Sequence, residues 1–389
     1  MKKKIAILGS TGSIGKSLID IIIKNKKQFE VVLLTANKND KLLLKQAKSL
    51  NAKNIIISDK SKFEKIFKKQ NKFKVYKDFN SLNKILNTKI DYIMSAITGI
   101  EGLEPTYLSI KHTKIIAIAN KESIICGWNI LKKELKKYKT NFVPVDSEHF
   151  SMWYALKNIQ KENIENIYLT ASGGPLLNTK INNFRNISVS RALKHPNWNM
   201  GKKITIDSAT MINKVYEVIE AKNLFNTDYK KLNILIHPKS YVHAILKFCN
   251  GMIKIIAHDT TMKIPIFNTI YNDNMKIKSE KINLNILNNL NFKKVDRKRY
   301  PMIDILKVLP NKQSLFETVI VAANDTLVNL FLKKKIRFTD IQKELFKIIK
   351  LKEFVKLKNY SPKNVADILK LNNYVRLKIM KKVYTFTNA

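Results

Sequence analysis

Cysteine and long apolar runs are scarce in this sequence. Cysteine occurs only twice in 389 residues, at Cys126 and Cys249, which excludes a disulfide framework and a cysteine-based zinc site. A reducing, cytoplasmic setting is therefore expected. No apolar run approaches the roughly 18–20 residues of a membrane span, and Met1 is followed by lysines and an apolar run, not by a secretion or transit signal. We expect no membrane association.

Acidic residues and arginine are also scarce. Thirty Asp and Glu stand against 72 Lys and Arg, for a net charge of +42. Such an excess suits a nucleic-acid-binding protein, which would bind a defined site with steep salt dependence. Only six of the basic residues are arginine, however, and the lysines are spread along the whole chain among many Asn and Ile. Nucleic-acid sites favour clustered Arg with interleaved aromatics. The pattern indicates A+T-rich codon bias, and we expect no specific nucleic-acid partner.

Apolar runs and helical stretches alternate over the first 145 residues, which predicts a parallel sheet with helices on both of its faces. Further strand-like runs, among them 166–170, 203–206 and 244–248, predict a second sheet, and the chain beyond about residue 314 has a helical pattern. The expected fold class is α/β. The predicted parts are a Rossmann-like parallel-sheet domain (1–145), an α+β catalytic domain (146–270), a connecting segment (271–311) and a C-terminal helical domain (312–389).

Three of only ten glycines lie within the seven residues Gly9–Gly15, between a predicted strand and a predicted helix. Glycine there lets backbone N–H groups approach a pyrophosphate at the positive end of the helix. The spacing is G-x-x-G-x-x-G, not the usual G-x-G-x-x-G. This context predicts a dinucleotide site, and the alternative is a tight turn without a ligand.

The second predicted strand is followed by Asn37, Lys38 and Asn39. An acidic residue near this position takes the ribose hydroxyl of NAD, whereas a lysine attracts the 2′-phosphate of NADP. Lys38 therefore favours NADPH. The acidic residue Asp40 lies close by, so binding of the NAD ribose stays an alternative.

Two carboxylates, Asp146 and Glu148, flank Ser147 after a predicted strand at 141–145. With a strand period of two they would share one face. Paired carboxylates suit a hard cation such as Mg²⁺ or Mn²⁺, and the alternative is a solvated acidic edge. The neighbouring His149 is a ligand or a packed core histidine.

The segment 207–217 has the pattern of a strand end, a cap and a helix. Asn213 and Glu217 are four residues apart and share a helix face. Ser208, Asn213 and Lys214 offer donors for an anion, and Glu217 offers a third oxygen ligand for the cation. The alternative is an amphipathic helix with a polar face.

Three further segments combine polar residues with turn signals. Ser172 precedes two glycines and offers a hydroxyl and exposed N–H groups to a phosphate, or else marks a plain turn. The segment 195–201 carries an aromatic, a histidine and a terminal glycine, as a lid or an anchored loop would. The third segment, Asn120, Lys121 and Glu122, follows a predicted strand. It lies at the carboxyl end of that strand, where α/β sheets place their sites. The alternative is that it only caps a helix.

In their order along the chain these segments, with 237–240 and 337–341, resemble the 1-deoxy-D-xylulose-5-phosphate reductoisomerase family over essentially its whole length. The segments 207–214 and 195–198 are the most specific part of the match. The resemblance implies a V-shaped homodimer acting on a small sugar phosphate, with NADPH and one Mn²⁺ or Mg²⁺ per subunit. It implies these cofactor contacts: Thr11, Gly12, Ser13, Ile14, Asn37, Lys38, Asn39, Asn120, Glu122 and Gly201.

The resemblance also implies the remaining roles. It assigns the metal to Asp146, Glu148 and Glu217. It assigns the substrate phosphate to Ser172, Ser208, Asn213 and Lys214, and the rest of the substrate to Lys121, Ser147 and His195, under a lid that carries Trp198. The implied reaction is the rearrangement and NADPH-dependent reduction of 1-deoxy-D-xylulose 5-phosphate to 2-C-methyl-D-erythritol 4-phosphate in isoprenoid precursor biosynthesis. The alternative is another NADP-dependent sugar-phosphate or semialdehyde dehydrogenase.

Overall fold

The computed structural model describes residues 1–68, 72–157, 159, 163–271 and 275–387. The chain divides into two compact units. Unit 1 comprises Met1–Ser123, Leu131–Phe150 and Met262–Lys278, and unit 2 comprises Ile124–Ile130, Ser151–Thr261 and Ser279–Ala389. The domain boundaries predicted after residues 145, 270 and 311 stay predictions.

Unit 1 is built on a seven-stranded sheet in the order β4-β3-β2-β1-β5-β6-β7. Every pairing in it is parallel, so the predicted parallel sheet is confirmed. Its strands are β1 (Lys3–Leu8), β2 (Phe29–Ala36), β3 (Asn54–Ile57), β4 (Lys74–Tyr76), β5 (Ile90–Ser95), β6 (Thr113–Ile118) and β7 (Asn141–Pro144). The four residues Ile5–Leu8 of β1 are fully buried, as a central strand covered on both faces requires.

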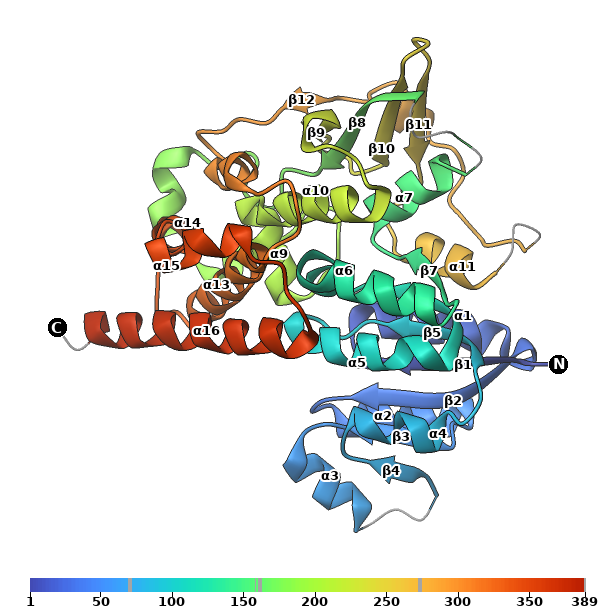
Figure 1. Ribbon diagram of the computed structural model, residues 1–389. Helices are drawn as coiled ribbons and strands as arrows, with labels where there is room; N and C mark the ends of the chain where they lie inside the picture. Colours follow the sequence, from blue (N-terminus) through green and yellow to red (C-terminus); the bar gives the residue numbers. More distant parts are fainter. Residues whose placement is uncertain (69–71, 158, 160–162, 272–274, 388–389) are drawn as a thin grey trace. The chain divides into compact units, whose positions relative to one another are not determined.

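Helices connect these strands in βαβ order (Figure 1). They are α1 (Ser13–Lys24), α2 (Asp40–Leu50), α3 (Lys60–Phe67), α4 (Leu82–Ile85), α5 (Leu103–Ser109), α6 (Lys121–Lys137) and the start of α7 (Ser147–Ala155). The later helix α11 (Lys263–Ile270) also belongs to unit 1, where Thr269 Oγ1 lies 2.7 Å from the hydroxyl of Tyr92 in β5. The middle of α6 belongs to unit 2.

Unit 2 contains a five-stranded mixed sheet in the order β11-β10-β8-β9-β12. Its strands are β8 (Ile164–Ala171), β9 (Leu232–Ile236), β10 (Val242–Phe248), β11 (Ile253–Ala257) and β12 (Lys293–Lys294). The strand β8 pairs antiparallel with β10 and parallel with β9. The predicted second sheet is therefore confirmed.

The prediction of a strand at 203–206 is wrong. These residues lie in α9 (Lys202–Thr210). The extended backbone of Gly201 begins the helix, and the hydroxyl of Thr205 donates to the Gly201 carbonyl at 2.9 Å. Burial of both Thr205 and Ile206 within the helix outweighs the strand preference of these β-branched side chains.

The predicted helical C-terminal part is confirmed. The other helices of unit 2 are α8 (Val189–Ala192), α10 (Ile212–Phe225), α12 (Leu284–Leu287), α13 (Leu315–Leu332), α14 (Phe338–Ile349), α15 (Lys352–Val355) and the long α16 (Val365–Thr387; red in Figure 1). Among the described residues, only α13 is long and apolar enough to cross a membrane by length and composition. Because 78% of it is buried within the fold, it has the character of a core helix.

A titratable carboxyl is buried at the start of α13. Glu317 accepts hydrogen bonds from the backbone N–H and the hydroxyl of Ser314, closing a capping box. Burial outweighs these bonds and raises the pKa of Glu317 from 4.5 to about 7. The folded chain thus holds a proton at a pH where the unfolded chain has released it.

This proton predicts a pH dependence of stability. Between pH 4.5 and about 7 the folded state binds more protons at Glu317, so the free energy of unfolding falls as the pH rises. Glu317→Gln keeps a cap donor and acceptor and removes the titration. Urea unfolding measures this effect. Between pH 5 and pH 8, we expect the free energy of unfolding of wild type to fall by about 3 kcal/mol relative to that of the variant. Parallel pH curves for the two proteins would contradict the raised pKa.

Candidate active site

The glycine turn joins β1 to α1. A Cβ on Gly15 would lie 2.5 Å from the Gly9 carbonyl oxygen, so only glycine permits this close approach of helix to turn. Ser10 is buried, and its hydroxyl donates to Gln46 at 2.8 Å, which fixes the turn to α2. Gly12 and Ser13 are exposed at the start of α1. The turn therefore presents backbone N–H groups at a positive helix end, as expected for a phosphate site.

The residues after β2 form the start of α2. Asn39 caps this helix by accepting from the Leu42 N–H at 3.2 Å. Lys38 is exposed, whereas Asp40 lies in the first turn of α2 with its carboxylate 3.6 Å from the Lys62 ammonium. The Asp40 carboxylate thus has a cation of its own, which favours Lys38 over Asp40 as the residue that selects the cofactor.

The start of α6 is rigidly held. The Asn120 side chain accepts from the Ser123 N–H at 2.6 Å and donates to the carbonyls of Ile97 and Gly99. Its amide therefore caps α6 and braces the loop after β5. The next two residues, Lys121 and Glu122, are both buried in the first turn.

Asp146 and Glu148 lie together at the start of α7, but not on a strand face. The strand β7 ends at Pro144 and α7 begins at Ser147, so the expectation from a period of two is wrong. Asp146 caps α7, with its carboxylate accepting from the Glu148 N–H at 3.3 Å. The turn nevertheless brings the two carboxylates within 4.8 Å of each other.

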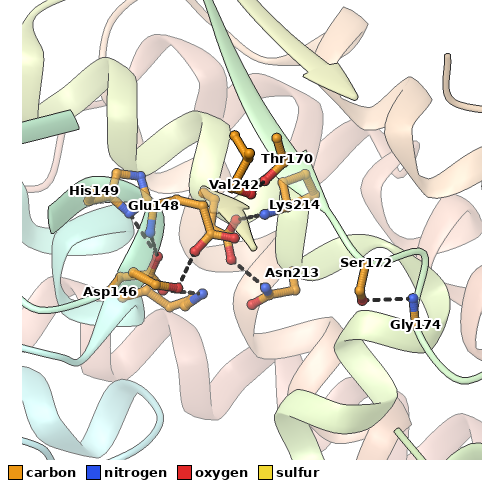
Figure 2. Close-up of polar contacts among 12 residues, drawn as sticks. Asp146, Glu148, His149, Thr170, Ser172, Gly174, Asn213, Lys214 and Val242 are labelled. Carbon is orange, nitrogen blue, oxygen red and sulfur yellow. Dashed lines mark hydrogen bonds and ion pairs between the residues drawn. The ribbon is translucent and has the colours of Figure 1, made fainter. Parts of the chain in front are cut away.

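The Asp146 carboxylate is surrounded by donors. His149 Nδ1 lies 3.2 Å from one oxygen (Figure 2). The Lys121 ammonium lies 2.9 Å from the other. Burial acts to raise the pKa of Asp146, but Lys121 and His149 outweigh it and hold the pKa well below its usual range. Ser147 donates to the Glu148 carboxylate. Asp146 is thus an anion throughout the neutral range, and Lys121 belongs to its site.

In unit 2, Ser172 follows β8 in a glycine turn (Figure 2). Gly174 has a φ of +67°, and a Cβ there would lie 2.6 Å from the Ser208 carbonyl oxygen. The turn therefore packs directly against α9. This close approach brings together Ser172 and Ser208, two of the residues expected at the phosphate.

The imidazole of His195 orients Ser172. Its Nδ1 accepts from the N–H groups of Asn197 and Trp198 at 3.2 and 3.0 Å, so the proton of the neutral ring is on Nε2. Nε2 donates to the Ser172 hydroxyl at 3.0 Å, and the Gly174 N–H donates to the same oxygen at 3.0 Å. Burial lowers the pKa of His195 to about 4. With two donors on its oxygen, the Ser172 hydroxyl keeps its own proton to donate to an acceptor such as a phosphate.

The loop 195–201 is tied to the sheet of unit 2. The Asn197 amide donates to Ser240 Oγ at 2.9 Å and to the Pro238 carbonyl. The Trp198 ring meets His243 edge-on at 6.1 Å. Gly201 is exposed, directly before α9.

A sharp corner joins α9 and α10. Met211 is buried with a φ of +67°, a strained conformation for a bulky side chain. Asp207 therefore lies in the last turn of a helix, not at a strand end as expected. The corner places Ser208 just before the first turn of α10, which carries Asn213 and Lys214.

The predicted phosphate and metal residues of α10 contact one another. Lys214 and Asn213 each donate to a different oxygen of the Glu217 carboxylate. Lys214 and Glu217 are 3% and 2% exposed, so the pair is almost fully removed from water. Glu220, one turn on, is buried as well.

An ionic network behind this corner was not expected from the sequence. Asp207 accepts from the Asn324 amide at 2.8 Å and lies 3.3 Å from the Lys203 ammonium. Lys203 also lies 2.9 Å from Asp325. The only local signal is the i, i+4 spacing of Lys203 and Asp207, because the partners in α13 are more than 100 residues away.

Comparison with known proteins matches the whole arrangement to one family. A family model for 1-deoxy-D-xylulose 5-phosphate reductoisomerase matches residues 5–127. A model for the C-terminal domain of the same enzyme matches residues 142–225, and a further model, for the DXP reductoisomerase C-terminal domain, matches residues 259–378. The chain is 61% identical over 382 residues to the 1-deoxy-D-xylulose 5-phosphate reductoisomerase of Pelagibacter ubique (strain HTCC1062), covering 97% of this chain and 98% of that protein. The chain belongs to the 1-deoxy-D-xylulose 5-phosphate reductoisomerase family.

Other members of the reductoisomerase family agree. The enzyme of Sulfurihydrogenibium sp. (strain YO3AOP1) is 38% identical, over 91% of this chain and 92% of that protein. The reductoisomerase from Zymomonas mobilis in complex with NADPH superposes with a TM-score of 0.85 at 31% identity, over 98% and 99% of the two chains. A DOX-P reductoisomerase in complex with NADPH, fosmidomycin and magnesium superposes with a TM-score of 0.90 at 28% identity, over 99% of each chain. The expected fold class and enzyme class, an NADP-dependent oxidoreductase, are thereby confirmed.

Proposed function

We propose that this chain converts 1-deoxy-D-xylulose 5-phosphate to 2-C-methyl-D-erythritol 4-phosphate with NADPH and one divalent cation, a step of isoprenoid precursor biosynthesis. The observation that carries this proposal is the 61% identity to a reductoisomerase across 97% of the chain. The donor sets of both units supply the chemistry that this reaction needs.

The NADPH site belongs to unit 1. The exposed turn of Thr11, Gly12, Ser13 and Ile14 would hold the pyrophosphate, and Lys38 with Asn37 and Asn39 would face the 2′-phosphate. The side chain of Asn120 is committed to bracing its own loop, so its role toward NADPH is to position the first turn of α6 with Glu122. Gly201 would complete the contacts from unit 2.

The metal site would join Asp146 and Glu148 with Glu217. All three are carboxylates, the ligand type that Mg²⁺ and Mn²⁺ prefer. The fit rests on Asp146 and Glu148 lying within 4.8 Å of each other and on the Asp146 pKa, which keeps that ligand charged. A bound cation supplies Lewis acidity at the substrate carbonyl and hydroxyl oxygens.

The residues of this chain bind, orient and enclose the substrate. Lys214, Asn213, Ser208 and the hydroxyl proton of Ser172 would hold its phosphate, and this remote binding energy would orient the reacting carbons. Lys121, Ser147 and neutral His195 would contact the sugar hydroxyls. The loop 195–201 would close over the site and exclude water while the hydride is transferred.

The decisive experiment follows NADPH absorbance with the purified protein, 1-deoxy-D-xylulose 5-phosphate, and either Mg²⁺ or Mn²⁺. We expect NADPH loss that requires the cation and that NADH does not replace. Folded protein without turnover in both metals would contradict the proposal and favour another NADP-dependent dehydrogenase. A thioester-forming dehydrogenase would need a nucleophilic cysteine; Cys126 is fully buried within α6, and Cys249 is exposed just after β10, outside every segment assigned to the site.

We also propose a homodimer in the cytoplasm. Cys126 and Cys249 are thiols, not a disulfide, as in a reducing compartment. The strand β11 forms an edge of the five-stranded sheet, where Ile253 and Ile255 are 57% and 47% exposed. An apolar edge strand pairs readily with another strand, and a second copy related by a two-fold axis offers an identical one.

Charging this edge is expected to separate the subunits. The double variant Ile253→Lys, Ile255→Lys places like charges opposite each other across a two-fold axis, so light scattering after gel filtration should show half the wild-type mass. Ile282→Lys is the matched control, since Ile282 is 73% exposed but lies outside the strand. A monomeric wild type, or a double variant that stays dimeric, would contradict this interface.

A further inference from the structure

The side-chain amide of Gln313 lies inside the hydrogen-bond ladder of α6. Its Oε1 accepts from the backbone N–H of Asn129 at 2.8 Å, and its Nε2 donates to the carbonyl of Ile125 at 2.7 Å. Asn129 and Ile125 are four residues apart, so these are the two groups that bond each other in a regular α-helix. Gln313 therefore takes the place of a backbone partner for both.

The Gln313 side chain is itself held in place. It is 5% exposed and directly precedes Ser314, the cap of α13. The backbone carbonyl of Gln313 accepts from the Ser361 hydroxyl at 2.9 Å. Its Nε2 also reaches the carbonyl of Ile124 at 3.3 Å, to which the Asn223 amide of α10 donates at 3.2 Å.

A glutamine suits this position because its amide has the donor and the acceptor of a peptide group. It satisfies both backbone groups of α6 without leaving either of them buried and unbonded. An apolar side chain at 313 would remove both of these bonds and release the middle of α6 from the start of α13.

We propose that Gln313 is a positioning residue for the reductoisomerase reaction, setting through α6 where Lys121 lies. This inference rests on the proposed function, in which Lys121 contacts the substrate. Lys121 begins α6, one turn before Ile125, and its ammonium lies 2.9 Å from Asp146. Loss of this anchor frees the first turn of α6 to shift relative to Asp146. Misplacement by about 1 Å is enough to cost roughly 10²-fold in rate.

The first test replaces the Gln313 clamp, the side-chain amide that bonds Asn129 and Ile125, by an apolar side chain of similar size. Gln313→Leu is expected to lower kcat about tenfold or more, with KM for the sugar phosphate changed less than about threefold, because the proposed phosphate residues all lie outside α6. Ser361→Ala is the matched control, since it removes a hydrogen bond to the same residue and leaves the amide in α6. Its kcat should stay within about twofold of wild type.

A second variant tests the hydrogen bonds themselves. In Gln313→Glu a protonated carboxyl still donates and accepts, whereas a carboxylate would face the Ile125 carbonyl without a proton. The ratio of variant to wild-type kcat should therefore fall as the pH rises from 6 to 9.

These measurements separate the two proposals. Absence of turnover in wild type overturns the proposed function and this inference together. An active wild type with kcat unchanged in Gln313→Leu overturns the positioning role alone, as does an equal loss of kcat in Ser361→Ala. If Gln313→Leu does not fold, a pH-independent activity ratio for Gln313→Glu overturns it.

Discussion

Replacing Glu217 by glutamine is expected to lower metal-dependent kcat by roughly 10³-fold, about 4 kcal/mol of transition-state stabilisation. The proposed site loses one of three anionic ligands, and a neutral amide oxygen binds a divalent cation weakly. The first turn of α6 and the glycine turn belong to unit 1, so NADPH binding should be retained. Steady-state rates in Mg²⁺ and Mn²⁺, with fluorescence titration of NADPH, measure both effects.

Glu165→Gln is the control for Glu217→Gln. It also neutralises a carboxylate bonded to a lysine, because Glu165 lies 2.8 Å from Lys247, but at an exposed position on β8. We expect it to keep wild-type turnover. Unchanged turnover in Glu217→Gln, with the fold intact by circular dichroism, would remove Glu217 from the metal site.

Replacing Lys214 by alanine is expected to raise KM for the sugar phosphate by about 10²-fold and to lower kcat as well, because a phosphate anchor contributes binding energy that orients the reacting carbons. Lys214 is 3% exposed and bonded to Glu217. Its loss also leaves a buried carboxylate without its cation, so the melting temperature should fall. Substrate kinetics, NADPH titration and thermal melting measure the three effects.

Lys222→Ala provides the comparison for Lys214→Ala. Lys222 lies at the other end of α10, where its ammonium donates to the Asn311 carbonyl. This variant should keep the wild-type KM. If Lys214→Ala weakened NADPH binding alone, the phosphate site would have to lie elsewhere.

Local pattern was enough to predict most of unit 1. The run 5–8 is apolar throughout, as a central parallel strand must be, and the helix predicted beside the glycine turn begins at Ser13. The same method failed at 203–206, where Ile204, Thr205 and Ile206 favour a strand by themselves. What decides that segment is packing against residues distant in sequence, which a local pattern does not contain.

The site was predicted as residue types more successfully than as geometry. Asp146 and Glu148 do lie together, but by a helix cap and not by strand alternation. The amide of Asn37, a residue expected at the cofactor, donates to the Ser58 hydroxyl, a contact that the local pattern did not predict. The clamp of Gln313 on Asn129 spans 184 residues, and no periodicity in the sequence announces such a contact.

The exposed edge at β11 has a consequence for a chain that has no partner strand at this edge. Unpaired apolar strands are templates for aggregation, and a freshly made monomer would carry this one uncovered. The net charge of +42 opposes random association, since like-charged chains repel within a Debye length of about 8 Å at physiological salt. The lysine excess, whatever its origin, thus favours colloidal stability, and concentrated salt should promote precipitation of the monomer.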